Sequence, residues 1–315
     1  MYRIIIFIYF ISLANLINAQ KVEVRIHEDA VYFVENKDSI LAYQIAEKSL
    51  NGAFKRTNYI HPIYGLDGQK LTEDFPADHP HHRGVFWAWR QLYIGDKRLG
   101  NSWEIKDFYW EISSVKELKV LGNAKIIQSK VLWKTNKWLD SDGKKKPVVK
   151  EITTIKVYPR ENDYRQIDIQ ISLLALEKNM RIGGSENDKG YGGFSCRVLF
   201  PEDIHFTGSK GTIEPNKFPV KSIGWMDFSW GYGKIGPQAG LSILCHPDNP
   251  GAQDYWILRA KGSMQNAVYP FPGATSVPLS NKQPTILRYR LLVHQGNSET
   301  IDINKVYADY IKTNI

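Results

Sequence analysis

Apolar and polar residues alternate with a period of two along much of the chain. Residues 22–26 follow this pattern as Val-Glu-Val-Arg-Ile, and residues 152–158 and 167–172 repeat it. Such alternation is typical of strands with one buried face and one solvated face. Asp142 and Gly143 separate two further strand-like runs, and this dipeptide favours a hairpin turn. We therefore expect a chain built mainly from antiparallel strands.

Residues 304–312 have a convincing helical pattern, because their apolar side chains recur at the spacing of one helix face. The sequence contains no internal repeat, low-complexity tract or linker, which disfavours a propeller and a multidomain chain. Many strands, few helices and this length predict two large stacked antiparallel sheets. The expected fold is an all-β sandwich with a C-terminal helix, formed by residues 20–315 as a single domain.

A short apolar run marks the N-terminus. It extends from Ile4 to Leu13 behind a single basic residue, and small or polar residues follow up to Ala19. This order predicts a signal peptide over residues 1–19, with cleavage after Ala19. A membrane span needs about 20 apolar residues, so the run is too short to be one. We expect export to the periplasm or the medium, and no membrane span.

The net charge of +8 limits the class of partner. Basic charge is typical of proteins that bind nucleic acid, anionic membranes or anionic substrates. The predicted export disfavours nucleic acid, and the only dense basic cluster, residues 144–146, lies in a predicted hairpin tip. An acidic oligosaccharide, sulfated or not, is the partner that fits the compartment best.

Composition leaves two pairs of alternatives open. Cys196 and Cys245 both lie in apolar runs, where they can form a disulfide in an oxidising compartment or remain buried thiols. The nine tryptophans and 17 tyrosines suit strands, and they also suit the aromatic platforms on which sugars stack. Composition alone separates neither pair.

Residues 78–84, Asp-His-Pro-His-His-Arg-Gly, carry the strongest chemical signal in the sequence. Four of the eight histidines lie between His61 and His82. Pro76 and Pro80 predict an irregular loop before the apolar run 85–89. Because loops at strand ends commonly hold binding residues, we expect a functional site here.

Three interpretations of this histidine loop compete. The histidines can carry protons while Arg83 pairs with a substrate carboxylate; they can bind zinc or copper; or they can cap loop carbonyls. The first is favoured, because clustered histidines beside an arginine are rare outside sites. If the chain is extended here, the neighbouring side chains of His81 and His82 point in different directions, so at least one of them is expected to be structural.

Two further clusters resemble the histidine loop in character. Tyr191 and Arg197 fall on one face of a strand that begins in a glycine-rich segment, an arrangement that suits a sugar acid or an ordinary β-bulge. His246 ends a strand before a proline- and glycine-containing loop, either as a functional group or as a structural turn residue. The remaining candidates are Trp103, Glu104, Trp225, Trp256 and Arg259.

Four features occur in order along the chain: Tyr59-Ile-His-Pro62, the histidine loop, Gly190-Tyr-Gly-Gly193 with Arg197, and His246-Pro247 with Asn249-Pro250. In these features the chain resembles the PmoA-like family, a family of unknown function labelled methane oxygenase. Its closest resemblance is to the ulvan oligosaccharide dehydratases of marine flavobacteria. The arrangement is also similar to the supersandwich fold of galactose mutarotases.

The resemblance implies a carbon–oxygen lyase that needs no metal or cofactor. Such an enzyme removes water from the non-reducing-end glucuronate or iduronate of ulvan-type oligosaccharides and leaves a 4,5-unsaturated uronate. A histidine, His82 or His81, suits the base, and Tyr191 suits the acid, with His246 as a substitute. The expected substrate-binding residues are His79, Arg83, Arg197, Trp103, Trp225, Trp256 and Arg259.

Two rival classes remain open: a non-catalytic glycan-binding protein, and a metal-dependent oxidoreductase or hydrolase that acts on sugars. They differ in what they need, since aromatic residues carry glycan binding and a bound metal carries the second class. The enzyme hypothesis further predicts that seven residues converge on one pocket. These are His79, His81, His82, Arg83, Tyr191, Arg197 and His246.

Overall fold

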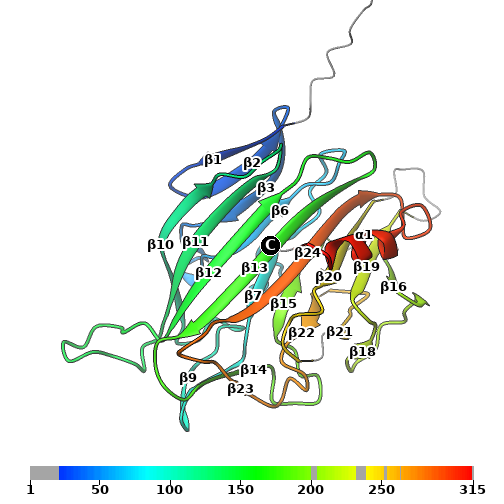
Figure 1. The fold of residues 1–315 in the computed structure, drawn as a ribbon. Helices are drawn as coiled ribbons and strands as arrows, with labels where there is room; N and C mark the ends of the chain where they lie inside the picture. The colour runs from blue at the N-terminus through cyan, green and yellow to red at the C-terminus, as the bar shows by residue number, and fades with distance from the viewer. Residues whose placement is uncertain (1–20, 200–203, 232–238, 252–253, 263, 314–315) are drawn as a thin grey trace, which may run out of the picture.

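The computed structural model describes residues 21–199, 204–231, 239–251, 254–262 and 264–313 (Figure 1). The predicted signal peptide lies outside these residues. Within them, no helix is long and apolar enough to cross a membrane.

Two nine-stranded antiparallel sheets dominate the described chain, as the alternating pattern predicted (Figure 1). The first contains, in spatial order, β1 (Val22–Ile26), β2 (Ala30–Glu35), β3 (Asp38–Gln44), β6 (Tyr59–Ile63), β7 (Val85–Ala88), β15 (Gly193–Cys196), β22 (Gln265–Val268), β21 (Tyr255–Ile257) and β18 (Val220–Lys221). The second contains β10 (Tyr109–Leu118), β11 (Lys125–Lys134), β12 (Val149–Val157), β13 (Tyr164–Ala175), β24 (Thr285–Gln295), β20 (Ala239–Cys245), β19 (Trp225–Trp230), β16 (His205–Gly208) and β17 (Gly211–Thr212).

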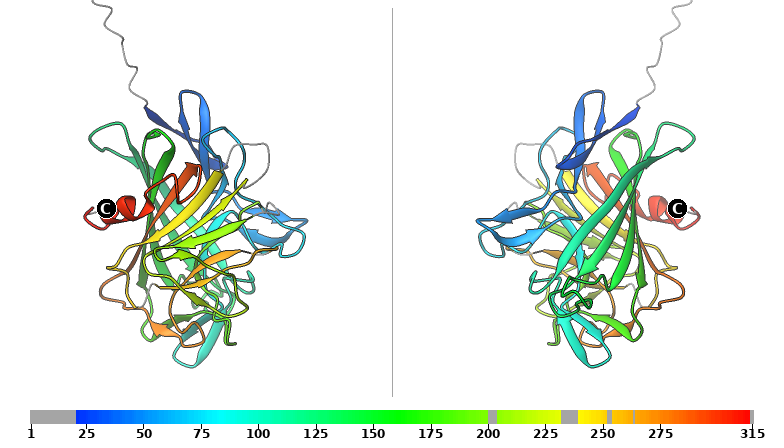
Figure 2. Two further views of the ribbon diagram at one scale, coloured as in Figure 1. Left: turned by 90° about the vertical axis from the view of Figure 1, so that its right-hand side faces the viewer. Right: turned by 90° about the vertical axis from the view of Figure 1, so that its left-hand side faces the viewer.

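Smaller elements complete the fold. The helix α1 (Ile303–Tyr310) packs on the outer face of the second sheet, where Leu244 and Leu292 meet its buried residues (Figure 2). The antiparallel sandwich with a C-terminal helix is therefore confirmed. The remaining strands are β4 (Lys48–Leu50) paired with β5 (Ala53–Arg56), and a four-stranded sheet of β23 (Val277–Pro278), β14 (Met180–Gly183), β8 (Gln91–Ile94) and β9 (Lys97–Gly100).

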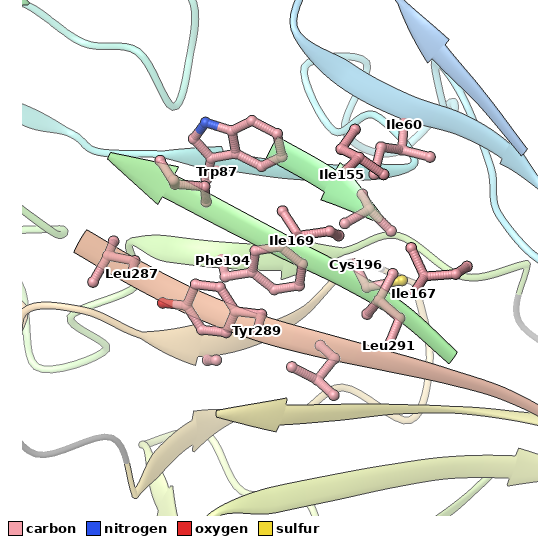
Figure 3. Close-up of a cluster of buried hydrophobic side chains, with 14 of the residues drawn as sticks. Ile60, Trp87, Ile155, Ile167, Ile169, Phe194, Cys196, Leu287, Tyr289 and Leu291 are labelled. Atoms are coloured by element: carbon pink, nitrogen blue, oxygen red, sulfur yellow. The ribbon is translucent and has the colours of Figure 1, made fainter. Parts of the chain in front are cut away.

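The main core lies between the two large sheets. Burial alternates residue by residue along β12, so every second side chain faces inward. The rings of Phe194 on β15 and Tyr289 on β24 stack with centroids 4.2 Å apart and join the two sheets (Figure 3). Cys196 and Cys245 are buried free thiols, which resolves that alternative against a disulfide. The β11–β12 connection contains the predicted turn, with Gly143 at a φ of 75°.

The histidine loop lies in the connection between β6 and β7, at one end of the first sheet. Three backbone hydrogen bonds attach this connection to the chain just beyond β15. They run from the amide of Glu73 to the carbonyl of Arg197, from the amide of Arg197 to the carbonyl of Gly84, and from the amide of Leu199 to the carbonyl of Leu71. Gly84 has a φ of 25°, and a Cβ there would lie 2.1 Å from the carbonyl oxygen of Ile60. Only glycine fits this position, which explains the last residue of the motif.

Candidate functional site

A cavity of about 440 Å³ lies beside the histidine loop. A larger one, of about 680 Å³, lies at the tip of the β10–β11 hairpin, where residues 117–125 and Lys21 supply neither imidazole nor aromatic groups. Chemical groups, rather than size, therefore point to the cavity beside the histidines. Its lining residues are His79, His81, His82, Trp103, Glu104, Lys189, Tyr191, Arg259, Gly262 and Met264.

A tight turn brings the three imidazoles of the loop together. The amide of His82 donates to the carbonyl of His79 over 2.8 Å. The rings of His79 and His82 stack in parallel with centroids 4.8 Å apart, and the ring of His81 lies edge-on to both, at 5.7 and 4.5 Å. The loop turns instead of extending, so the opposite directions expected for an extended chain do not apply, and His81 and His82 both line the cavity.

Burial keeps two of these imidazoles neutral. It lowers the pKa of His82 to about 2 and that of His81 to about 4, and the neighbouring histidines add to both effects. The Nδ1 atom of His82 is buried without a hydrogen-bond partner. A neutral imidazole has no positive charge with which to bind an anion. Its lone pair can accept a hydrogen bond or a proton, and the lower the pKa, the weaker the ring is as a base.

His79 has a carboxylate partner. Its Nδ1 lies 2.8 Å from Oδ2 of Asp78, and Arg197 binds both oxygens of that carboxylate, with Nη2 2.7 Å from Oδ1 and Nη1 3.1 Å from Oδ2. Burial alone would raise the pKa of the Asp78 carboxyl, but the hydrogen bonds from Arg197 and His79 outweigh it and hold that pKa well below its ordinary value. Asp78 is therefore ionised at neutral pH.

Tyr191 and Trp103 form the aromatic wall of the cavity. Their ring centroids lie 4.9 Å apart, and Nη1 of Arg90 donates to the Tyr191 hydroxyl over 2.6 Å. Arg90 also forms an ion pair with Glu104, at 2.6 Å. Sequence reasoning missed Arg90. The sequence could have indicated Arg90 only by its position, two residues after the end of β7, the strand that follows the histidine loop.

Arg259 and Lys189 supply positive charge to the lining. The Arg259 guanidinium is held by backbone carbonyls, with Nη1 2.8 Å from those of Asn216 and Leu258. It forms no ion pair among the described residues. Burial lowers the pKa of Arg259, and Tyr191 partly offsets that shift. Lys189 was missed as a candidate, although it directly precedes the glycine-rich segment that was identified.

The structure places Arg83 and Arg197 on carboxylates of the protein itself, which corrects their expected role as substrate partners. Arg83 is fully buried, and it donates to the carboxylate of Asp74, to the hydroxyl of Tyr59 at 2.6 Å and to the carbonyl of Phe54 at 3.0 Å. Neither arginine lines the cavity. The guanidinium nitrogens of both arginines are already bonded to groups of the protein, so none remains to hold a substrate carboxylate. Both side chains instead stabilise the histidine loop.

His246, Trp225 and Trp256 do not join the cavity, which corrects the expected convergence. His246 packs edge-on against Tyr310 of α1, with ring centroids 5.2 Å apart. The indole of Trp225 donates to Asn304, also on α1, and Trp256 is fully buried in the core. For His246 and Trp225 the reason lies in the topology, because β19 and β20 belong to the second sheet and α1 covers that sheet's outer face. Trp256 is on β21 of the first sheet, and its side chain faces the main core instead of the cavity.

No group of three or more His, Cys, Asp or Glu side chains with metal-binding geometry occurs among the residues that the structure describes. Of the three rings of the histidine loop, one is bonded to a carboxylate and two are buried and neutral.

Comparison with known proteins identifies the family. The model of a family of unknown function, DUF6807, matches residues 31–308. No curated protein sequence matches the chain. Among solved structures, the chain is similar to a putative mutarotase (YeaD) from Salmonella typhimurium, with 9% identity, a TM-score of 0.29, and coverage of 88% of this chain and 94% of that one. Because the family model spans most of the chain, the protein belongs to this family of unknown function, DUF6807.

Proposed function

We propose that the protein is a carbohydrate-active lyase that removes water from the non-reducing-end uronate of an acidic, ulvan-type oligosaccharide. The observation that carries the proposal is the cavity itself, which combines three imidazoles, an arginine-bound tyrosine hydroxyl and two cationic side chains. The motif resemblance to PmoA-like proteins and to ulvan oligosaccharide dehydratases supports the same reaction. The predicted signal peptide supports export to the compartment where such oligosaccharides occur.

Dehydration across C4 and C5 of a uronate has three chemical requirements. The carboxylate must be neutralised so that the C5 proton becomes acidic, and here Arg259 and Lys189 are the available cations. A base takes the C5 proton, and the electron pair forms the C4–C5 double bond. The C4–O bond breaks, and an acid protonates the leaving hydroxyl to give water. Each proton-transfer step contributes about 10²–10⁴-fold to the rate.

Tyr191 suits the acid because of its partner. As its hydroxyl gives up a proton, negative charge develops on the oxygen, and the Arg90 guanidinium lies within hydrogen-bond distance of that charge. The imidazoles that line the same cavity suit the base, since a neutral ring accepts a proton. The indole of Trp103 lies against both His82 and Tyr191, with ring centroids 5.8 and 4.9 Å away, so the proposed acid and base share one cavity.

The cavity also limits the substrate. Its volume of about 440 Å³ falls within the range typical of small-ligand sites, which suits the terminal residue of an oligosaccharide. The aromatic wall of Trp103 and Tyr191 can stack on a sugar face. These features support action at a chain end, in agreement with a reaction at the non-reducing terminus.

The test is turnover of oligosaccharides that end in glucuronate or iduronate. Mass spectrometry should show the loss of one water, accompanied by the ultraviolet absorbance of a conjugated uronate. Tyr191→Phe should lower turnover by about 10²–10⁴-fold, because it removes only the proposed proton donor. Tyr32→Phe, remote on β2, is the matched control and should retain full turnover. Binding of these oligosaccharides without any loss of water would instead favour the glycan-binding class.

A further inference from the structure

The three imidazoles of the cavity are not equivalent, because only one is bonded to a carboxylate among the described residues. Nδ1 of His79 lies 2.8 Å from Oδ2 of Asp78. The ring nitrogens of His81 and His82 form no hydrogen bond with any residue that the structure describes. The two terminal nitrogens of Arg197 in turn bind the two carboxylate oxygens of Asp78. Arg197, Asp78 and His79 thus form one continuous hydrogen-bonded chain that ends at the cavity.

We propose that His79 is the base of this cavity, and that Asp78 and Arg197 are positioning residues that set its tautomer and orientation. The inference rests on the proposed function and deepens it, since it assigns the proton acceptor to a histidine expected only to bind substrate. It also gives Arg197 a role that its buried, carboxylate-bound guanidinium supports.

The tautomer follows from the charge of Asp78. An ionised carboxylate only accepts hydrogen bonds, so the Nδ1 atom of His79 must carry the hydrogen. The lone pair is then on Nε2, which makes no hydrogen bond within the described chain. The His79 side chain lines the cavity and is 44% exposed, so it can exchange the proton it takes with solvent. Parallel stacking on His82 fixes the plane of the ring.

His81 and His82 lack this arrangement. Glu104 raises the pKa of His81 from a distance but forms no hydrogen bond with it, and burial remains the larger effect. The Nδ1 atom of His82 is buried, and no residue that the structure describes bonds to it and selects its tautomer. A base is most effective when a third group orients it, as in the triads of hydrolases.

Arg197 is well placed to hold Asp78 still. Its side chain is 4% exposed, and Nε donates to Glu73 over 2.9 Å while the other two nitrogens bind Asp78. The backbone of Arg197 is itself bonded on both sides to the β6–β7 connection, through Glu73 and Gly84. Asp78 is one of the exposed residues of the loop, and its position is thereby tied to the end of β15.

Asp78→Asn tests the assignment, because it keeps the size of the side chain and removes its charge. We expect kcat on a uronate-terminated oligosaccharide to fall by about 10²–10⁴-fold with KM changed by less than about threefold. Nitrogen NMR of the His79 ring should show the Nδ1–H tautomer in the native protein and a mixture in the variant. Asp142→Asn, at an exposed hairpin tip, is the matched control and should change neither.

A second variant separates positioning from stability. Arg197→Gln removes the fork beneath Asp78, and we expect a smaller loss of kcat, about tenfold, together with a shift of the His79 ring towards the mixed tautomer. A variant that melts earlier but keeps the native tautomer and kcat would show that Arg197 is only structural. An Nε2–H tautomer in the native protein, or an unchanged kcat in Asp78→Asn, would overturn the assignment.

The NMR measurement needs no substrate, so it tests the hydrogen-bonded chain even if the proposed reaction fails. Absence of turnover in the native protein together with the expected tautomers would reject the dehydratase and keep the positioning of His79. Turnover together with the wrong tautomer would keep the dehydratase and move the base to His81 or His82.

Discussion

Two loops of this protein look alike in sequence and differ in what surrounds them. Residues 78–84 and residues 245–251 each place a histidine beside a proline at the end of a strand. In the first loop the rings face a cavity of about 440 Å³. In the second, His246 packs against Tyr310, because α1 covers the end of its strand. What lies over a strand end decides whether its histidine meets solvent or core.

The partners of the two histidines differ as well. His79 binds Asp78, a carboxylate that Arg197 holds in place. Nδ1 of His246 accepts a hydrogen bond from the amide of Asp248, two residues along the chain, at 3.2 Å. That bond closes a local turn and places the ring hydrogen on Nε2, which is buried beneath α1 rather than directed at the cavity. The two histidines therefore differ in how closely a carboxylate is held: Asp78 lies 2.8 Å from His79 and is fixed by Arg197, whereas Asp248 lies 3.6 Å from His246.

The largest expected effect separates these two histidines directly. His79→Ala should lower turnover of uronate-terminated oligosaccharides by about 10²–10⁴-fold, because it removes the proposed base. His246→Ala should stay within about threefold of the native rate, since its ring lies under α1. Steady-state kinetics at saturating substrate measures both. A large loss in His246→Ala with native melting behaviour would break the contrast between the loops.

A buried arginine–aspartate pair also lies near each loop. The next largest expected effect is the loss of folding stability when the arginine of either pair is replaced. Arg83 binds Asp74 beneath the histidine loop, and Arg290 binds Asp168 beside Tyr310. Arg83→Met and Arg290→Met should each destabilise the fold by about 3–5 kcal/mol, because each leaves a carboxylate without its partner. Urea unfolding measures the change. A stable Arg83→Met variant with impaired substrate binding would restore Arg83 as a substrate residue.

Some of these features could be predicted from the sequence and others could not. Alternation predicted the sheets, the spacing of 304–312 predicted α1, and clustered histidines predicted the cavity. These features depend on neighbouring residues, which is why local patterns reveal them. The partners of the arginines depend on the fold instead: Arg197 meets Asp78 across 119 positions, and no local pattern records that contact.

Arg90 is a residue of the cavity that the sequence did not predict. It was not a candidate, because an arginine after an aromatic strand is unremarkable in sequence. Its contact with Tyr191 spans 101 positions and exists only because β7 and β15 are neighbours in the first sheet. His246 was a candidate because its surroundings in sequence resemble those of the histidine loop. The helix that covers it begins more than fifty positions later.

A smaller effect concerns one arginine near each of the two loops: Arg259, which lines the cavity, and Arg288, beside His246. Arg259→Ala should raise KM for uronate-terminated oligosaccharides by about 10–100-fold with a lesser change in kcat, since hydrogen bonds to charged groups contribute about 1.5–3 kcal/mol. Arg288→Ala, beside His246, should leave KM unchanged because it lies outside the cavity lining. The pairwise comparison of KM values measures the effect. Equal KM values for the two variants would remove Arg259 from the site.

The smallest effect is on stability as the pH falls. Burial lowers the pKa of His82 to about 2 and also lowers that of His246, where Asp248 partly offsets the shift. The folded protein thus excludes protons that the unfolded chain binds below its ordinary histidine pKa of about 6.5. Stability is complete above that pH and declines below it, by up to about 1.4 kcal/mol per pH unit for each such histidine. Urea unfolding at about pH 7 and about pH 5 should therefore show a smaller acid loss in His82→Gln than in the native protein, and an intermediate loss in His246→Gln. Equal losses in all three proteins would mean that the two rings are protonated in the folded state, contrary to the burial of both.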